Sequence, residues 1–263
     1  MRRNKLSELL KADKPSIGTH VHSPWPTVME LVGLTGMYDY VEYVSEYAPY
    51  DLHTFENLAR AIELYDMSSM IKVEQEPRSH LASRAIGAGI QNVLFADVRN
   101  VSDARECVNA VRAETPKTGG QHGASMRRNM GFGMAGGLPE FVDAMEDAVI
   151  AVMIEKAPAV ENLEAILAVG GLDMVQFGPG DYSMSIGHPG EYGNEKVSEA
   201  EKFVIETSLK MGVAPRAEIG APDQAGRYLD MGVKHFCIGT DVSILMDWFR
   251  TRGEEMRRVL EGA

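Results

Sequence analysis

Cysteine is scarce in this sequence, and no secretion signal is visible. Cys107 and Cys237 are the only cysteines among 263 residues, and they lie far apart. The chain does not open with a positively charged start followed by an apolar run of signal-peptide length. These absences predict a reduced protein with a cytoplasmic location.

Basic residues are outnumbered, and long apolar runs are missing. Lys and Arg total 26 against 38 for Asp and Glu, which gives a formal net charge of −12. Such a charge repels nucleic-acid phosphates and anionic membrane surfaces. No segment approaches the roughly 20 apolar residues that a membrane-spanning helix requires. We therefore expect neither a nucleic acid nor a membrane as a partner.

The sequence does contain a repeated alternation of strand-like and helical patterns. Hydrophobic residues make up 44% of the chain, enough for one large core. Strand-like runs begin at about Ile17, Tyr40, Ser69, Asn92, Val149, Met174, Ala214 and His235. Helical spacing of apolar residues recurs at about 52–65, 101–113, 161–169, 198–211 and 223–231. This alternation predicts an α/β protein with a single domain, residues 1–263, folded as a (β/α)8 TIM barrel.

A doubly wound sheet that binds a nucleotide is the competing architecture. Its glycine-rich turn should directly follow the first strand. Here the first run continues instead into His22-Ser-Pro-Trp-Pro26. The sequence therefore favours the barrel.

One connection is much longer than the others. From about residue 114 to residue 139 the chain is rich in Gly, Lys, Arg and polar residues. A connection of this length within a compact domain is usually functional. We expect it to form a lid or an interface element.

Acidic residues follow two successive strand-like runs. Glu155 ends Ala-Val-Met-Ile-Glu, and Asp181 ends Val-Gln-Phe-Gly-Pro-Gly-Asp. The carboxyl ends of barrel strands converge on one mouth, so the two carboxylates should be neighbours. Two carboxylates without a cysteine or histidine cluster suit a hard ion such as Mg²⁺ or Mn²⁺ with open coordination positions. The alternative for either acid is a helix cap or an ion pair with lysine.

Other polar residues at the strand ends suggest what such an ion would act on. A 2-oxo acid could chelate the ion through its carboxylate and carbonyl oxygens, which makes a metal-bound enolate accessible. The growing negative charge needs a nearby cation, for which Lys72 is the candidate. His20, His22 and Tyr47 compete for the acid/base role. Further polar residues in strand-end positions are Glu46, Glu74, Asp97, Arg99, Arg216, Glu218 and Asp241.

The turn before Asp181 is a candidate binding element. The free amides of the tight turn Gly178-Pro179-Gly180, together with Ser183, could hold a substrate carboxylate. Ordinary turn chemistry explains the Gly-Pro-Gly sequence equally well.

Taken together, several short motifs resemble the HpcH/HpaI aldolase/citrate lyase family of class II metal-dependent 2-oxo-acid aldolases. They are Glu155, Gly178-Pro179-Gly180-Asp181-Tyr182-Ser183 and Gly239-Thr240-Asp241, with Glu46-Tyr47-Ala48-Pro49 similar to the family's Glu-His-Ala-Pro. The resemblance runs from about residue 18 to residue 260. It implies a (β/α)8 barrel, often a hexamer built from trimers, and a pyruvate enolate. It also implies Mg²⁺, Mn²⁺ or Co²⁺ held by Glu155 and Asp181.

The chain departs from the family pattern in its acid/base residues. Tyr47 stands in place of the catalytic histidine, and Val44 replaces an aspartate three positions earlier. Lys72 replaces the arginine that contacts the pyruvyl oxygen, which keeps the charge without the bidentate fork. His20 and His22 stand where typical members have uncharged residues. They face the same side of a strand, and either could carry the proton or support a loop as a hydrogen-bonded pair.

Two further features bear on substrate and assembly. His122, on the long connection, matches a region that lies near the substrate in the family, so we expect a substrate contact there. Trp248 and Phe249 on a late helix predict packing against a second subunit or against the barrel floor. The chain is therefore expected to be a homo-oligomer, a trimer or hexamer.

The sequence thus predicts a divalent-metal-dependent carbon-carbon lyase that cleaves or forms a 4-hydroxy-2-oxo acid. One alternative keeps the metal and the enolate but catalyses condensation, decarboxylation or another lyase reaction on a related oxo acid with a rebuilt acid/base site. Another alternative is a non-catalytic barrel that binds metal and oxo acid.

Overall fold

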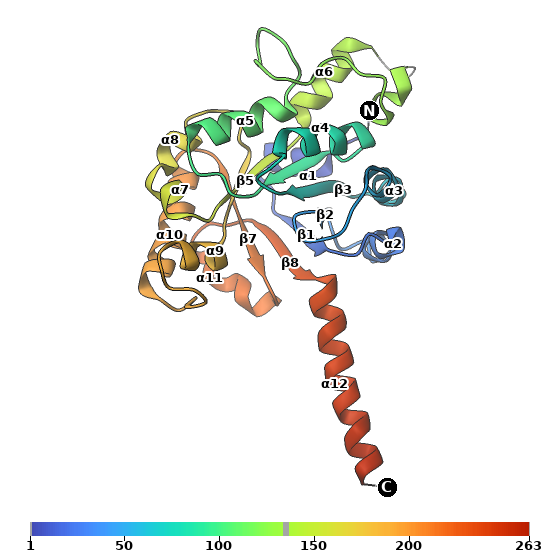
Figure 1. Ribbon diagram of the computed structural model, residues 1–263, viewed down its shortest axis with the longest axis vertical. Coiled ribbons are helices and arrows are strands. Elements are labelled where there is room, and N and C mark those ends of the chain that lie inside the picture. Colours follow the sequence, from blue (N-terminus) through green and yellow to red (C-terminus); the bar gives the residue numbers. More distant parts are fainter. Residues whose placement is uncertain (1, 134–136, 263) are drawn as a thin grey trace.

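Eight parallel strands close into a barrel in the order in which they occur in the sequence (Figure 1). The computed structural model of the chain describes residues 2–133 and 137–262. The strands are β1 Ser16–Val21, β2 Tyr40–Val44, β3 Ser68–Val73, β4 Asn92–Phe95, β5 Ile150–Ile154, β6 Met174–Phe177, β7 Ala214–Ile219 and β8 His235–Thr240. β8 pairs with β1 and completes the ring. The (β/α)8 prediction is confirmed, and each strand begins within one residue of its predicted start.

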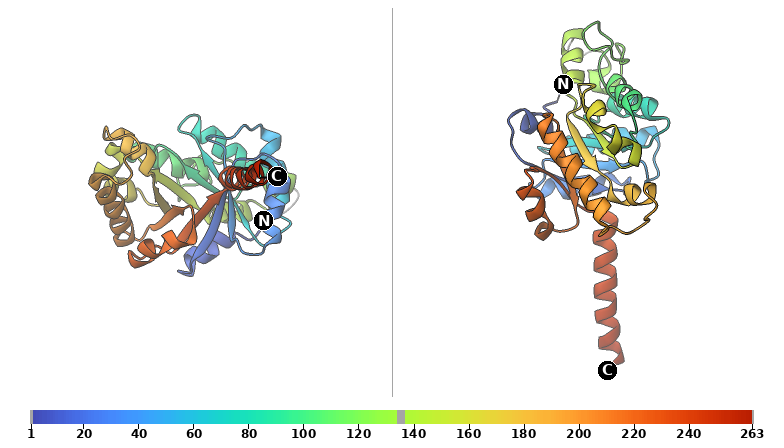
Figure 2. Two further views of the ribbon diagram at one scale, coloured as in Figure 1. Left: turned by 90° about the horizontal axis from the view of Figure 1, so that it is seen from below. Right: turned by 90° about the vertical axis from the view of Figure 1, so that its left-hand side faces the viewer.

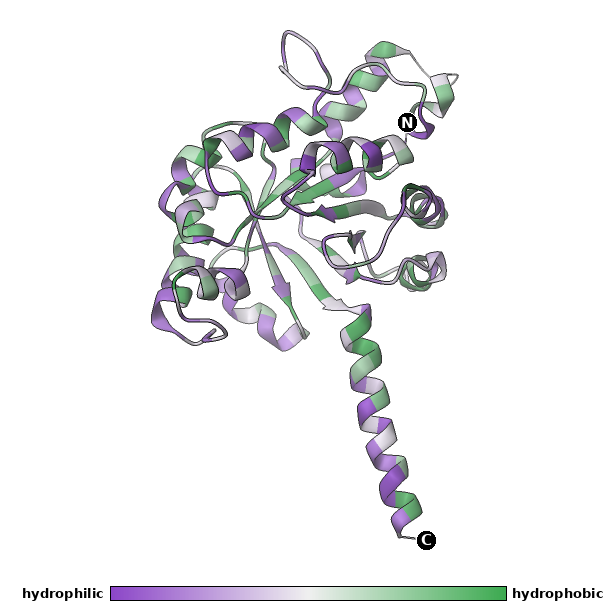
Figure 3. Ribbon diagram, viewed as in Figure 1, coloured by the Kyte–Doolittle hydropathy of each residue, from purple (hydrophilic) through white to green (hydrophobic). Residues whose placement is uncertain are grey.

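Most of the helices cover the outside of this ring. The helices are α1 Lys5–Lys11, α2 Pro26–Leu34, α3 Leu52–Ile62, α4 Arg78–Ala88, α5 Val101–Val111, α6 Leu138–Asp147, α7 Ala157–Glu161, α8 Leu163–Leu167, α9 Pro179–Ser185, α10 Glu195–Lys210, α11 Ala225–Asp230 and α12 Asp241–Glu261, with short 3-10 helices η1 Arg128–Gly133 and η2 Pro222–Gln224. Apolar residues run along the strands in Figure 3, while the outer helices carry mixed polar and apolar residues. None of the helices in the described ranges combines the length and apolar character that a bilayer-spanning segment needs.

The N-terminal helix closes the floor of the barrel. Leu6 on α1 is fully buried and belongs to one apolar cluster with Tyr40, Met70 and Leu94 from the strands. Asn4 caps α1 and also donates a hydrogen bond to the Asn92 side chain at 2.8 Å. The floor is therefore filled by α1, and the alternative that the late aromatic helix closes it is wrong.

The long connection between α5 and α6 lies at the floor end of the barrel and not over its mouth. Arg128 pairs with Glu63 at the end of α3 and donates to the carbonyl oxygen of Ala88 at the end of α4. In a βα barrel each helix runs back from the mouth, so helix ends mark the floor. The structure therefore does not support the expectation of a lid, while an interface role stays a prediction. Residues 134–136 of this connection lie outside the described residues.

The last helix leaves the body of the protein. α12 projects away from the barrel as a single rod, as Figure 1 and the right-hand view of Figure 2 show. No residue of this helix is buried. Its start is fixed because the Asp241 carboxylate accepts the backbone N–H groups of His22 and Ser23 at 2.8 and 2.9 Å. The helix thus has a defined base beside β1 and an uncovered length beyond it.

Candidate active site at the barrel mouth

A cavity of about 950 Å³ opens at the carboxyl ends of the strands. It extends from the barrel mouth to the base of α12, where Ile244 and Trp248 line it. Nine residues that the sequence predicted for the site lie in its wall, namely His20, His22, Tyr47, Lys72, Glu155, Gly178, Pro179, Gly180 and Asp181. The structure therefore brings most of the predicted residues to one place, as convergence of strand ends requires.

Glu155 is held at the end of β5 with one oxygen engaged. Its side chain is 3% exposed, and Oε1 accepts the backbone N–H of Asp97 at 2.8 Å. Asp97 has a φ of 54°, a strained conformation that directs this N–H at the carboxylate. A Cβ on Gly178 would lie 2.6 Å from Oε2, so only glycine leaves room for the carboxylate there. Burial raises the pKa of Glu155 to about 7, although Lys72 and the Asp97 N–H oppose this shift.

Asp181 lies in the first turn of α9 and is already paired. The ammonium of Lys156 contacts Asp181 Oδ1 and lies 3.2 Å from Asp97 Oδ1. Lys156 follows Glu155 directly in the sequence, yet its ion pairs are with the two aspartates. The sequence left open that either acid pairs with a lysine, and Asp181 does form such an ion pair, with Lys156.

The donor chemistry at this position fits a divalent metal ion. Glu155 is a buried carboxylate, and repulsion from Asp181 contributes to its raised pKa, so a cation between them would be favourable. Within residues 2–133 and 137–262 no group of three His, Cys, Asp or Glu side chains is arranged to hold an ion. Two protein carboxylates leave several positions for water and substrate, which suits Mg²⁺ or Mn²⁺ better than a closed protein cage.

The positively charged side chain that the sequence predicted for the site, Lys72, lies on β3. Its Nζ lies 2.6 Å from Glu46 Oε2 and 5.0 Å from the centre of the Tyr47 ring. Burial alone would lower its pKa, but Glu46 and Glu155 outweigh this effect and raise it. The side chain therefore carries a positive charge at the barrel mouth, close to the carboxylate of Glu155.

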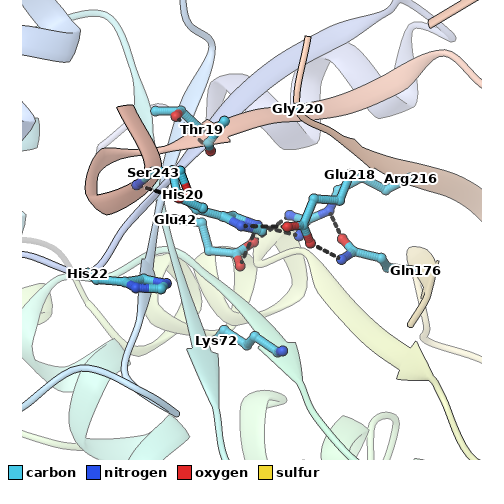
Figure 4. Close-up of polar contacts among 12 residues, drawn as sticks. Thr19, His20, His22, Glu42, Lys72, Gln176, Arg216, Glu218, Gly220 and Ser243 are labelled. Carbon is cyan, nitrogen blue, oxygen red and sulfur yellow. Dashed lines mark hydrogen bonds and ion pairs between the residues drawn. The ribbon is translucent and has the colours of Figure 1, made fainter. Parts of the chain in front are cut away.

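A buried polar network crosses the barrel beside these residues (Figure 4). Arg216 and Glu42 form an ion pair with both side chains fully buried. His20 lies between two acids, with Nε2 3.2 Å from Glu42 Oε1 and Nδ1 3.4 Å from Glu218 Oε1. Burial opposes protonation of His20, but Cys237, Glu42 and Glu218 together hold its pKa well above its usual value. Both ring nitrogens of His20 thus face acidic partners, which makes it a poor general base.

His22 and Tyr47 occupy a different part of the mouth from this network. Figure 4 shows the His22 side chain lying apart from His20 and its partners. Its ring centre lies 6.1 Å from that of Tyr47, in an edge-on arrangement. Burial raises the pKa of Tyr47 despite the nearby Lys72, so the phenol stays protonated at neutral pH. His20 is held between two carboxylates, and Tyr47 is a phenol with a raised pKa. Neither description applies to His22, the third acid/base candidate.

Two predicted substrate contacts do not reach the cavity. Ser183 is fully buried, donates to the Gly180 carbonyl at 2.7 Å and accepts the Gly190 N–H at 3.1 Å. It therefore shapes the turn around Asp181. His122 is buried near Ser83 of α4 and Phe141 of α6, outside the barrel. The connection that carries His122 packs at the floor end of the barrel, which explains why His122 does not contact the mouth.

The turn before Asp181 offers fewer free amides than its sequence suggests. Gly178 donates its N–H to the carbonyl of Ile154 at 3.1 Å, and Pro179 has no N–H. Of the three turn residues, only Gly180 can therefore present an amide to a ligand. The main contribution of the turn is to place Asp181 and to leave space for Glu155.

Sequence reasoning did not identify Glu42, Gln176 or Lys156. Gln176 accepts from Arg216 at 2.6 Å and donates to Glu218 at 3.0 Å, which completes the network. Glu42 interrupts the apolar run of β2, and a charge in a buried strand needs a partner. That interruption was a usable signal, but its partner lies 174 residues away.

Comparison with known proteins gives a consistent family match. The model of the family described as HpcH/HpaI aldolase/citrate lyase matches residues 21–247. A pyruvate aldolase of Rhizobium etli is 31% identical over 248 residues, covering 92% of this chain and 93% of that protein. A 4-hydroxy-2-oxo-heptane-1,7-dioate aldolase of Klebsiella pneumoniae is 28% identical, covering 92% and 89%. The crystal structure of a HpcH/HpaI family protein from Burkholderia cenocepacia superposes with a TM-score of 0.87 at 27% identity, covering 97% of this chain and all of that one.

Proposed function

Because this chain belongs to the HpcH/HpaI aldolase/citrate lyase family and is a carbon-carbon lyase, we propose that it cleaves or forms a 4-hydroxy-2-oxo acid through a pyruvate-type enolate. The observation that carries this proposal is the grouping of Glu155, Asp181 and Lys72 in one cavity wall. Relatives named as aldolases of pyruvate and of a 4-hydroxy-2-oxo acid support the same substrate class. The comparisons favour an enzyme over a non-catalytic binding barrel.

We propose that Glu155 and Asp181 hold a divalent ion, Mg²⁺, Mn²⁺ or Co²⁺. When bound, such an ion polarises the carbonyl of a chelated 2-oxo acid. Glu155 contributes Oε2, since Oε1 already accepts the Asp97 N–H. The amide of Gly180 is placed to contact the substrate carboxylate at the start of α9.

Lys72 stabilises the negative charge that appears on the substrate carbonyl oxygen. As the bond between C3 and C4 breaks, its electron pair moves toward that oxygen. A preorganised ammonium in a buried setting stabilises this charge without reorganisation. Glu46 fixes the position of Lys72, since the two side chains are 2.6 Å apart.

For the proton we propose His22 as the carrier, with Tyr47 beside it as a hydrogen-bond donor. In the cleavage direction the base takes the proton of the 4-hydroxyl group and later returns a proton to C3. Both ring nitrogens of His20 already face Glu42 and Glu218, so its role is to hold the network in place.

Replacement of His22 by asparagine should lower kcat about 10²- to 10³-fold, because general acid/base catalysis contributes effects of this size. Tyr47→Phe should lose less than about tenfold, since it removes one hydrogen-bond donor. Steady-state kinetics of both variants would measure this difference. If Tyr47→Phe is inactive and His22→Asn retains full kcat, the assignment of the base is wrong.

The test of the proposed function is proton exchange at C3 of pyruvate. The protein is incubated with pyruvate in deuterated buffer, with and without Mn²⁺ or Mg²⁺, and the methyl signal is followed by NMR. We expect exchange that requires the added ion. Tight ion binding without exchange of any 2-oxo acid would contradict the lyase proposal.

We further propose that the protein is a homo-oligomer, a trimer or hexamer, held partly by α12. Leu245, Trp248, Phe249, Met256, Val259 and Leu260 recur at helical spacing along this helix. Each of these side chains is at least 53% exposed. Helices in proteins gain most of their stability from packing of such a face, so a second copy is its natural partner.

Cys107 and Cys237 are both buried and unpaired, which supports the expected cytoplasmic location.

Phe249→Glu should reduce the mass of the assembly, because it places a charge in the apolar face. Thr251→Glu adds the same charge on another side of the helix and serves as the matched control. Light scattering after gel filtration should show a multiple of 28.8 kDa for wild type and the control. A wild-type mass of one chain, or an unchanged mass for Phe249→Glu, would contradict an assembly through α12.

A further inference from the structure

Lys156 occupies an unusual place in the proposed metal site. Its side chain is 18% exposed and lies over the start of α7, immediately after Glu155. The ammonium contacts Asp181 Oδ1 and lies 3.2 Å from Asp97 Oδ1. A positive charge is thus already in contact with one of the two carboxylates that would bind a divalent cation.

The contacts of Lys156 leave the other carboxylate for the ion. Its ion pairs are with Asp97 and Asp181, and neither involves Glu155. Oε2 of Glu155 faces Gly178, the residue that begins the turn leading to Asp181. An ammonium on Asp181 therefore satisfies half of the acidic pair, and an ion that binds both acids has to compete with it.

Asp97 provides a second acidic partner for the ammonium of Lys156. Its backbone N–H positions Glu155, and its side chain already lies within ion-pair distance of Lys156. Lys156 can therefore leave Asp181 without losing every acidic partner. Two cations cannot share one carboxylate oxygen closely, because like charges at such distances repel strongly.

We propose that Lys156 is an internal counter-ion of the metal site, which pairs with Asp181 in the ion-free protein and is displaced onto Asp97 when a divalent cation binds. This inference rests on the proposed function, since it assumes that Glu155 and Asp181 bind the ion. Its consequence is a site whose negative charge is partly neutralised when no ion is bound, and which binds the ion more weakly and reversibly than two free carboxylates would.

The test is the Mn²⁺ affinity of Lys156→Met, measured by the loss of the free Mn²⁺ EPR signal without any substrate. We expect binding about tenfold tighter than wild type, because a competing ion pair and a repulsive charge are both removed. Lys156→Arg keeps the charge and should stay within about threefold of wild type. Lys202→Met is the matched control, because it removes an exposed lysine from the surface of α10 and should leave affinity unchanged.

A second readout uses the same proteins and covers poor folding of one variant. Thermal unfolding with and without Mn²⁺ should show a larger ion-induced rise of Tm for Lys156→Met than for wild type. If Lys156→Met does not fold, Lys156→Gln takes its place in both measurements.

Equal or weaker Mn²⁺ binding by Lys156→Met, with Lys202→Met unchanged, would overturn the counter-ion role. Absence of Mn²⁺ binding by both wild type and Lys156→Met would overturn the metal site itself. Failure of the lyase proposal has a different signature, since Mn²⁺ would then bind with the expected order of affinities while pyruvate exchange is absent.

Discussion

Glu155→Gln should lose ion-dependent exchange of the pyruvate C3 protons by on the order of 10³-fold or more. Glutamine has the same shape, and its carbonyl oxygen can still accept the Asp97 N–H that Glu155 accepts at 2.8 Å. The variant therefore removes the charge and retains the local structure. Exchange would be followed by NMR at saturating Mn²⁺.

The fold of this variant should be intact. Burial raises the pKa of Glu155 to about 7, so a neutral amide in its place should not lower the metal-free Tm. Glu164→Gln on α8 is the matched control, because it removes the same charge at an exposed position. If Glu155→Gln keeps more than about a tenth of wild-type exchange, Glu155 does not hold a required ion.

Lys72→Met should lower kcat about 10²- to 10³-fold, the loss expected when one preorganised donor to a developing oxyanion is removed. The effect should fall mainly on kcat, because Lys72 acts on charge that appears during bond cleavage. Steady-state kinetics in the cleavage direction would separate kcat from KM. Lys72→Arg keeps the charge and should recover part of the lost rate.

Glu46 complicates the interpretation of that variant, since Lys72→Met leaves a largely buried acid without its partner at 2.6 Å. The double variant Lys72→Met/Glu46→Gln removes both charges and should restore stability without restoring kcat. Glu46→Gln alone should retain most of the activity. A Lys72→Met protein with normal kcat and a raised KM would show that Lys72 binds substrate without stabilising the enolate.

The barrel and most of its mouth could be predicted from the sequence because both follow from local patterns. Each strand is a short apolar run followed by helical spacing, and eight repeats of this unit have few other ways to fold. Residues directly after the strands, such as Glu155 and Asp181, then converge without any knowledge of long-range contacts. Lys72 and His22 were found by the same rule.

The remainder depends on contacts between distant parts of the chain. Glu42 and Arg216 form their buried ion pair across the barrel, and nothing in the sequence of either strand names the other. The connection from 114 to 139 was expected to form a lid or an interface element because of its length, but length does not tell at which end of the barrel it packs. Arg128 fixes it at the floor through Glu63.

The position of α12 shows a further limit. Its apolar face was visible in Trp248 and Phe249, yet the spacing is equally compatible with packing on the barrel's own outer surface. Only the structure shows that the helix leaves the body (Figure 1). Lys156 was not singled out in the sequence, since only the path of α9 brings Asp181 to it.

The central claim is that Glu155 and Asp181 together hold a divalent ion to which a 2-oxo acid is chelated. Crystals grown with Mn²⁺ and pyruvate, measured at a wavelength where manganese scatters anomalously, test it directly. We expect one strong anomalous peak between the two carboxylates, with pyruvate density beside it and the Lys156 ammonium on Asp97. Pyruvate bound in the cavity with no anomalous peak at Glu155 and Asp181 would contradict the account.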